Sequence, residues 1–145
     1  MSPSSSDSLT VVLYSDDPRV REQVRMAVGR RPAPDLPRVE WLETATVEEV
    51  LLAVDAGGVS LCVLDGEAWP TGGMGIARQL KNEIADCPPC LVVTGRDDDH
   101  WLARWSQADA VLTHPVDALA AADAVARLLR QRLAALPVRQ GRTGR

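Results

Sequence analysis

Short polar side chains follow several of the apolar runs in this sequence, at the points where buried strands would end. They include two carboxylates, two hydroxyls and an imidazole. Hard cations such as Mg²⁺ are bound by carboxylate and carbonyl oxygens together with water and phosphate. Gathered in one crevice, these groups would suit the binding of Mg²⁺ and a phosphoryl group. The candidate residues are Ser15, Asp16, Asp65, Thr94 and His114.

Alternating strands and helices would hold these residues. Short runs rich in Val and Leu predict strands, and the amphipathic segments between them predict helices. Asp17 before Pro18 is typical of a helix start, and Thr46 with Glu49 has the spacing of a capping box. We expect strands at 9–14, 38–43, 59–65, 90–94 and 108–113, and helices at 17–28, 46–54, 76–84, from 97 through 105, and at 117–136.

This alternation predicts an α/β fold made of right-handed βαβ units. The usual solution at this size is a flavodoxin-like three-layer αβα sandwich whose five-stranded parallel sheet has the order 2-1-3-4-5. The carboxyl ends of strands one, three, four and five then meet at one edge, where open α/β folds bind ligands. We expect a disordered lead-in at 1–8, one domain at 9–136 and an Arg-rich flexible tail at 137–145.

The composition limits the classes of function. A net charge of −4 over 145 residues gives no case for binding nucleic acid or a membrane surface. No apolar run reaches the roughly 18 residues that span a bilayer. Lys81 is the only lysine, so a lysine-dependent mechanism has a single candidate. The three cysteines cannot all pair with one another, and the first eight residues lack the features of a secretion signal. We therefore expect reduced thiols and a cytoplasmic location.

Four motifs in order carry a resemblance to a known family. They are Asp-Asp-Pro after the first strand, Leu-Asp at the end of the third, Val-Thr-Gly after the fourth and Leu-Thr-His-Pro after the fifth. With this order and spacing, residues 9 to 135 resemble the receiver domain of bacterial response regulators. The resemblance implies that Asp65 is the equivalent of the phosphorylated aspartate and that Asp16 is one acid of a metal-binding pair. It also implies that Glu67 offers its backbone carbonyl to the metal and that Thr94 follows the phosphoryl group.

The sequence departs from the family pattern at four places. Ser15 stands where the first acid of the pair belongs, which removes a charge from the metal site. His114 replaces the lysine before the final Pro, and Val111 replaces the aromatic switch residue of strand five. The loop after Asp65 is about two residues longer than the family pattern and brings Trp69 near the pocket. No DNA-binding domain follows, so the chain resembles a stand-alone, degenerate receiver.

Each candidate residue also has a purely structural interpretation. Asp65 before Gly66 could be a turn residue at a strand end, Asp16 could be a helix-start acid, and His114 could be no more than a strand-end residue. Two further sites are disfavoured. Cys87-Pro88-Pro89-Cys90 has redox spacing, but it leaves a helix instead of starting one, so no helix N-terminus would stabilise a thiolate. Zinc would need more ligands than Cys62 and the two histidines supply.

A second surface could bind a protein partner. Trp101 and Trp105 share one face of the fourth expected helix, and Trp is favoured at binding hot spots. This face could equally be core packing. Arg127 and Arg130 belong to an Arg-rich last helix that is either a solvated face or a docking element for an acidic partner.

Three functions compete on this evidence from the residues. The leading one is a non-enzymatic regulatory or adaptor module that binds a protein partner and needs no cofactor. The resemblance extends to stand-alone receivers that associate with the respiratory NADH:quinone oxidoreductase at the membrane, although no residue here encodes that partner. The alternative is a working receiver of a two-component system that accepts phosphate from a histidine kinase on Asp65, with Mg²⁺. The third is a flavin protein, which the two acids and the proline after strand one disfavour.

Overall fold

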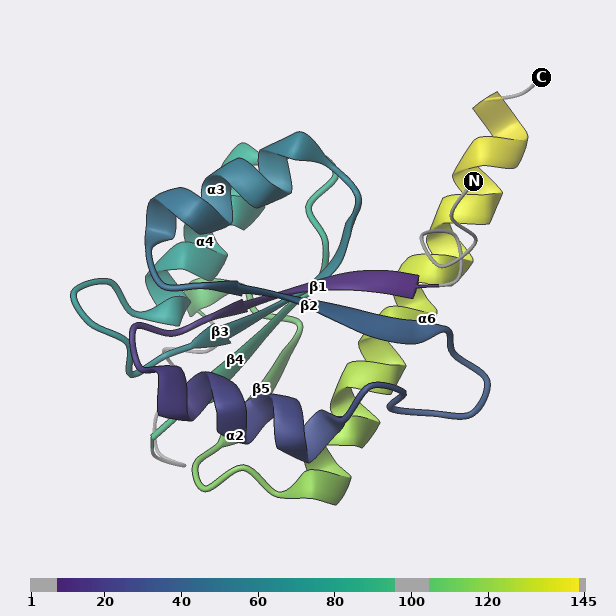
Figure 1. Ribbon diagram of the computed structural model, residues 1–145. Helices are drawn as coiled ribbons and strands as arrows, with labels where there is room; N and C mark the ends of the chain where they lie inside the picture. The colour runs from purple at the N-terminus through teal and green to yellow at the C-terminus, as the bar shows by residue number, and fades with distance from the viewer. Residues whose placement is uncertain (1–7, 96–104, 144–145) are drawn as a thin grey trace.

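The computed structural model describes residues 8–95 and 105–143, with side chains through residue 135. Its centre is a five-stranded parallel sheet of order β2-β1-β3-β4-β5, as predicted (Figure 1). The strands are β1 (Ser8–Tyr14), β2 (Arg38–Thr44), β3 (Val59–Asp65), β4 (Cys90–Thr94) and β5 (Ala110–Thr113), and the helices are α2 (Pro18–Val28), α3 (Val47–Ala56), α4 (Gly73–Glu83) and α6 (Ala118–Thr143).

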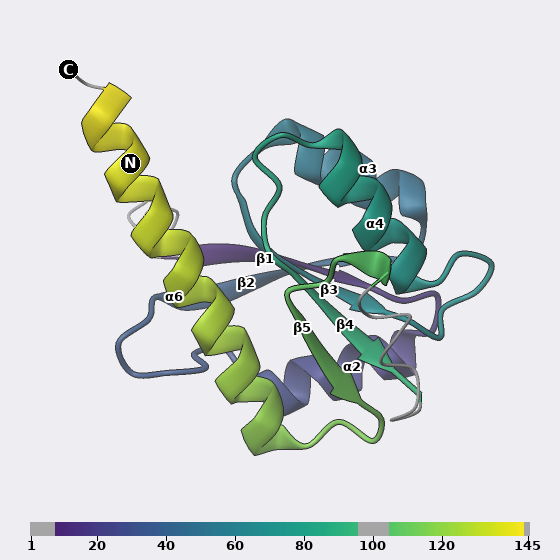
Figure 2. The same ribbon diagram turned by 180° about the vertical axis from the view of Figure 1, so that it is seen from behind.

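The helices cover both faces of the sheet, so the predicted three-layer sandwich is confirmed. Helices α2 and α6 lie on one face, and α3 and α4 lie on the other (Figures 1 and 2). Each face has its own aliphatic core, because successive residues of a strand point to opposite sides. Leu61 and Val63 of β3 belong to the core with α2 and α6, whereas Cys62 and Leu64 belong to the core with α3 and α4.

Strand β3 holds the centre of the sheet and presents Asp65 at its end. All seven of its residues are buried, because β1 and β4 pair with it on either side and helices cover both faces. A strand buried on both faces reads as a nearly continuous apolar run. Asp65 is therefore the point at which this run meets the carboxyl edge of the sheet.

Local capping signals fix the starts of α2 and α3. The Asp17 side chain accepts a hydrogen bond from the Arg19 amide, and Pro18 occupies the first helical position. Helix α2 ends at Gly29, whose φ of 79° lies in the left-handed region that favours glycine. The capping box of Thr46 and Glu49 is complete in both directions. These features confirm the two predicted helix starts and place Ser15 and Asp16 in the turn between β1 and α2.

Several boundaries differ from the sequence prediction by one or more residues, including those of α4, β5 and α6. Helix α4 begins at Gly73 instead of residue 76, because a glycine there allows the helix to approach the end of β3 closely. Strand β5 begins at Ala110 instead of residue 108. Helix α6 continues to Thr143, past the predicted end near residue 136, and so runs through Pro137. Its last turns project beyond the sheet (Figure 1).

Two predictions concern segments that the structure covers only in part. The helix expected from 97 through 105 falls mainly on residues 96–104, outside the described residues, and so does its Trp101. The lead-in at 1–8 lies almost entirely outside them. Within the described part of the chain, no helix is both long enough and apolar enough to cross a bilayer.

Candidate functional site

The predicted site residues converge at the carboxyl edge of the sheet. A cavity of about 360 Å³ opens there, between the end of β3, the start of α2 and the segment after β5. Ser15 and Thr94 are buried beneath this edge, with 0% and 1% of their surface exposed. The residues that line the cavity are Asp16, Asp17, Val20, Gln23, Asp65, Glu67 and His114.

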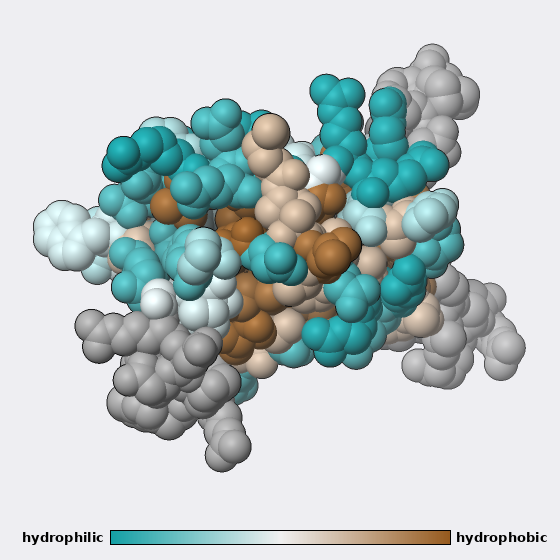
Figure 3. Space-filling view, turned by 90° about the horizontal axis from the view of Figure 1, so that it is seen from below, coloured by the Kyte–Doolittle hydropathy of each residue, from teal (hydrophilic) through white to brown (hydrophobic). Residues whose placement is uncertain are grey.

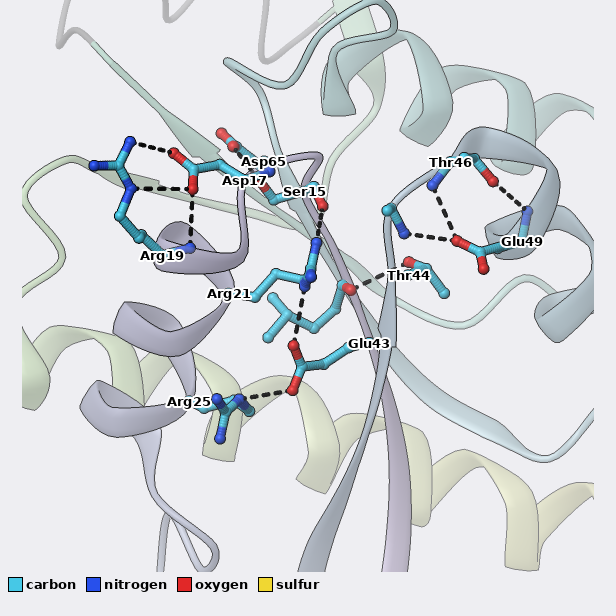
Figure 4. A network of polar contacts seen from close by, with 12 residues as sticks. Ser15, Asp17, Arg19, Arg21, Arg25, Glu43, Thr44, Thr46, Glu49 and Asp65 are labelled. Atoms are coloured by element: carbon cyan, nitrogen blue, oxygen red, sulfur yellow. Dashed lines mark hydrogen bonds and ion pairs between the residues drawn. The ribbon is translucent and has the colours of Figure 1, made fainter.

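Ser15 is hydrogen-bonded directly to Asp65. The Ser15 hydroxyl donates to Asp65 Oδ2 at 2.8 Å and accepts from the Asp17 amide at 3.0 Å. Since a hydroxyl has one proton, the second contact leaves that proton committed to the carboxylate. The Ser15 carbonyl in turn accepts from Arg21 Nη1 at 2.6 Å, and Arg21 also pairs with Glu43 (Figure 4). Ser15 is therefore a neutral donor to Asp65, and both its hydroxyl and its carbonyl are held by hydrogen bonds.

The other oxygen of Asp65 has two neighbours. The Glu67 amide donates to Asp65 Oδ1 at 2.9 Å, and His114 Nε2 lies 3.8 Å from the same atom. The imidazole forms an ion pair only when it is protonated, whereas a lysine would carry its charge throughout the physiological pH range. Asp65 is only 4% exposed, so these contacts, together with Ser15, provide much of the carboxylate's environment.

Asp16 faces the loop that follows β3. Its Oδ1 accepts a hydrogen bond from the Trp69 amide at 3.0 Å, and its side chain is exposed at the rim of the cavity. Below it, the buried Tyr14 hydroxyl donates to the Thr71 carbonyl of the same loop. Burial raises the pKa of Tyr14, and the nearby Asp16 and Asp65 carboxylates raise it further. Asp16 thus both adds negative charge to the site and ties down the loop.

Thr94 ends β4 beside Asp65 in the sheet. Its hydroxyl donates to the Leu112 carbonyl at 3.3 Å, and its own carbonyl accepts from the His114 amide at 2.8 Å. Glu67 reaches back across the edge, where its Oε2 accepts from the Gly95 amide at 3.3 Å. The ends of β3, β4 and β5 are therefore linked by polar contacts. The structure brings the five candidate residues to one edge, as the topology predicted.

The donors present are of the types that bind a hard cation, but they include one carboxylate fewer than the acid pair and central aspartate of the resembled pattern would supply. Asp16 and Asp65 supply carboxylate oxygens, and Glu67 supplies a backbone carbonyl, which are ligand types that Mg²⁺ accepts. Among the described residues, no three His, Cys, Asp or Glu side chains form a group that could hold a metal. The predicted Mg²⁺ ligands are two side chains and one backbone carbonyl, which is not a group of three side chains, so this site stays a prediction. Asp65 and Asp16 each already accept a hydrogen bond from a backbone amide.

Of the predicted partner-binding residues, the structure describes Trp105, Arg127 and Arg130, and none of them lines this cavity. Trp105 is 46% exposed, and the Arg78 guanidinium lies 4.7 Å from its ring centroid. Arg127 is exposed on α6. Arg130 instead forms a two-point ion pair with Asp35, at 2.9 and 2.8 Å. Arg130 therefore has an intramolecular role that the sequence did not reveal, because Asp35 is 95 positions away.

The three cysteines lie together near the opposite edge of the sheet. Cys62 and Cys90 are register partners on β3 and β4, and all three thiols are free. The hydrogen bond with Cys90, followed by burial, raises the pKa of Cys87. The hydrogen bond with Cys62 is the main contribution that raises the pKa of Cys90. A redox site needs a stabilised thiolate, so these shifts disfavour a redox role, as the sequence does.

Several residues that hold the site were not among the residues predicted from the sequence. Arg21, Tyr14 and the Trp69 amide each hold a part of it. Only Trp69 could have been suspected, because the lengthened loop after Asp65 carries it. The tyrosine hydroxyl and the Arg21 guanidinium depend on where the chain folds back, which local patterns do not encode.

Comparison with known proteins adds the family context. The sequence matches no protein-family model. It is 53% identical over 128 residues to proteins of two Mycobacterium tuberculosis strains, CDC 1551 and H37Rv, both described as uncharacterized response regulatory proteins. The match covers 88% of this chain and 96% of each relative.

Solved structures show the fold. The receiver domain of the Francisella response regulator 1452 superposes with a TM-score of 0.71 at 14% identity, covering 85% of this chain and 98% of that one. A Thermotoga maritima response regulator in complex with Mg²⁺-BeF superposes with a TM-score of 0.67 at 19% identity, covering 83% and 98%.

Proposed function

We propose that this chain, which belongs to the response regulator family and has the fold of its receiver domains, is a regulatory module that binds a protein partner with little or no phosphorylation of Asp65. Receiver domains of this family are generally signalling modules without enzymatic activity, which agrees with the assignment as a non-enzyme. The proposal narrows that general role to one in which the phosphoryl site is held by hydrogen bonds within the chain.

The contact between Ser15 and Asp65 carries the proposal. Phosphoryl transfer needs a carboxylate oxygen of Asp65 to attack phosphorus while cations neutralise the phosphoryl oxygens. Here Oδ2 accepts a hydrogen bond from the Ser15 hydroxyl at 2.8 Å, which makes this oxygen a weaker nucleophile. Replacement of an acid by a hydroxyl also removes one negative charge from the donors available to Mg²⁺. Both effects lower the rate of transfer.

His114 acts in the same direction. A lysine before the final Pro would bring a permanent positive charge toward the phosphoryl group. His114 lies 3.8 Å from Asp65 Oδ1 and is charged only when protonated. Charge stabilisation of a transferred phosphoryl group would therefore be weaker here than in a receiver with the complete pattern.

Protein partners remain the functional output in this proposal. Trp105 and Arg127 are exposed and stay proposed contacts, together with Trp101. The family resemblance suggests a histidine kinase, or the cytoplasmic face of a respiratory NADH:quinone oxidoreductase, as the class of partner. A cytoplasmic location follows from either choice.

The experiment that tests this proposal compares partners of the wild-type chain and Asp65→Asn. Each tagged protein is purified from its native cell, and the co-purified proteins are quantified by mass spectrometry. Because phosphorylation is not required, we expect the same partners in equal amounts. Loss of the partners in Asp65→Asn, with an unchanged unfolding curve, would contradict the proposal.

A working phospho-accepting receiver is the second candidate. The cavity beside Asp65 and the buried Thr94 hydroxyl favour it, and a solved relative of the same fold is in complex with Mg²⁺-BeF. Asp16, Asp65 and the Glu67 carbonyl would hold Mg²⁺, which supplies charge neutralisation when bound. Incubation with acetyl phosphate and Mg²⁺ separates the candidates. A stoichiometric phosphoryl adduct in the wild type that is absent from Asp65→Asn would establish the second function.

A further inference from the structure

Trp69 is a large apolar side chain that folding leaves in water. It is 76% exposed, on the loop between β3 and α4 that projects from the body at the carboxyl edge (Figures 1 and 2). Tryptophan carries more apolar area than almost any other side chain, so its exposure forgoes a sizeable gain from burial. Single exposed apolar residues are common on protein surfaces. A binding role therefore needs further evidence from the loop itself.

The loop is tied to the body on both sides of Trp69. The Trp69 amide donates to Asp16 Oδ1 at 3.0 Å, and the preceding amide, of the buried Ala68, donates to the Asp65 carbonyl at 3.2 Å. Two residues later, the Thr71 carbonyl accepts from the Tyr14 hydroxyl. The backbone that carries the exposed ring is therefore held in place. A side chain presented in this way loses less conformational freedom on binding, which favours affinity.

The surroundings of Trp69 are acidic. Four carboxylates and one imidazole line the adjoining cavity, namely those of Asp16, Asp17, Asp65, Glu67 and His114. Arg19 lies next to this surface, 3.4 Å from Asp17, and Arg21 reaches the Ser15 carbonyl, so these two guanidinium groups offset part of the negative charge. A complementary partner must offer an apolar pocket for an indole ring and positively charged groups around it.

We propose that Trp69 is the anchor of a docking surface for a protein with an apolar pocket and a basic rim, and that Asp16 is the residue that positions it. This inference rests on the proposed partner-binding function and assigns the contact to Trp69 at the rim of the Asp65 pocket instead of to Trp105. Asp16 has two roles. Its Oδ1 accepts a hydrogen bond from the Trp69 amide, and its negative charge attracts the basic rim.

A second apolar surface serves as the internal comparison. A cavity of about 680 Å³ between α2 and the start of α6 is lined in part by Met26, Ala27 and Val116. Apolar side chains form a band across this side of the molecule (Figure 3). Its rim carries both signs of charge, from Arg19 and Glu22, and so selects no particular partner. The observations therefore favour Trp69 over this groove.

The test measures affinity for a purified partner. A protein that co-purifies with the wild-type chain is first identified and purified. Its affinity is then measured for the wild type and for Trp69→Ala. We expect the dissociation constant to rise at least about tenfold, as for hot-spot tryptophans. Added salt should slow association, because screening weakens the attraction between the acidic and basic surfaces. With 5-fluorotryptophan in place of tryptophan, the ¹⁹F signal of residue 69 should shift when the partner binds.

Matched variants separate anchoring from folding. Leu52→Ala and Met26→Ala truncate side chains that are 71% and 76% exposed on other surfaces, and both should bind as the wild type does. Asp16→Ala should weaken binding because it releases the loop, whereas Asp16→Asn retains an acceptor for the Trp69 amide and should weaken it less. The unfolding midpoint of Trp69→Ala should equal that of the wild type, since the ring is exposed.

Each outcome decides between the inferences. Equal affinity of Trp69→Ala and the wild type overturns this docking surface and leaves the proposed function intact. Loss of binding in Met26→Ala but not in Trp69→Ala moves the contact to the groove between α2 and α6, and also overturns it. If the wild-type chain retains no partner, the proposed function itself fails, and this inference fails with it.

Discussion

At the scale of single residues, Ser15 decides what the Asp65 carboxylate can do. The Ser15 hydroxyl is smaller than a carboxylate and uncharged, and it donates a 2.8 Å hydrogen bond to Asp65 Oδ2, where a second acid would repel that oxygen. Without a cation, two adjacent carboxylates would be costly, since like charges raise each other's pKa. Ser15 removes this cost, so the edge is stable as it stands. The same replacement weakens the attraction for Mg²⁺.

Ser15→Asp should therefore restore cation binding. The added carboxylate lies next to Asp65 and attracts the cation. A unit charge nearby contributes about 1–4 kcal/mol, so we expect Mg²⁺ to bind about tenfold more tightly or better. Without Mg²⁺ the variant should unfold at a lower temperature, and Mg²⁺ should raise its midpoint more than that of the wild type. Thermal unfolding across a Mg²⁺ titration measures both effects. Ser15→Ala is the control, and an affinity in Ser15→Asp no higher than in this control would refute the argument.

At the scale of elements, the approach of α4 to β3 fixes the geometry of the loop that carries Trp69. Gly73 begins α4 against the end of β3. A Cβ at this position would lie 2.8 Å from the carbonyl carbon and the Cβ of Leu64. Gly75, in the same helical turn, faces open space, and a Cβ there would meet nothing within 4 Å. The two glycines thus differ in packing although they share one helix.

Gly73→Ala should destabilise the protein, whereas Gly75→Ala should not. Forcing a methyl group against the backbone of β3 costs about 1–3 kcal/mol, as overpacking usually does. At position 75 the change should be neutral or should stabilise the helix by up to about 1 kcal/mol, because alanine has the higher helix propensity. Urea unfolding of both variants measures the difference. Equal free energies of unfolding would mean that α4 does not approach β3 closely.

At the scale of the whole molecule, ion pairs and caps join segments that are distant in the sequence. Arg130 of α6 pairs with Asp35 in the loop between α2 and β2, and this side-chain hydrogen bond lowers the pKa of Asp35. Backbone hydrogen bonds, from Ala45 first, lower the pKa of Glu49. A carboxyl whose pKa is lower in the folded state stabilises the fold above its unfolded pKa, and this contribution is lost as the pH falls through the folded value.

The free energy of unfolding should therefore fall in acid as Asp35 and Glu49 become protonated, and substitution of these two residues tests this cause. Between neutral pH and about pH 5 these carboxyl groups should contribute fully, and below about pH 4 their contribution should decline as the pH falls through the lowered folded-state pKa values. The double variant Asp35→Asn, Glu49→Gln should be less stable at neutral pH and should lose less stability between about pH 5 and about pH 3. Urea midpoints at a series of pH values test this. An identical acid slope in the double variant and the wild type would exclude these carboxyl groups as the cause.

The order of the elements and the place of the site were available from the sequence. Apolar runs bounded by Gly and Pro predicted β3 at its observed bounds, Val59–Asp65, and the alternation of strands and helices predicted the sheet order. These features depend on neighbouring residues and on general rules for parallel sheets. For that reason Asp65, Thr94 and His114 could be assigned to one edge from the sequence alone.

What the site does with those residues was decided by the tertiary structure. The Ser15 hydroxyl donates to a carboxylate 50 positions away, the Trp69 amide donates to one 53 positions away, and Arg130 pairs with one 95 positions away. Such contacts depend on loop paths and side-chain rotamers, which local periodicity does not determine. The sequence by itself therefore predicted the receiver fold, which is confirmed, and an altered phosphoryl pocket, which stays a prediction. Only the fold revealed that a hydroxyl holds its central carboxylate and that a neighbouring acid fixes an exposed tryptophan, because both facts are distances between residues far apart in the chain.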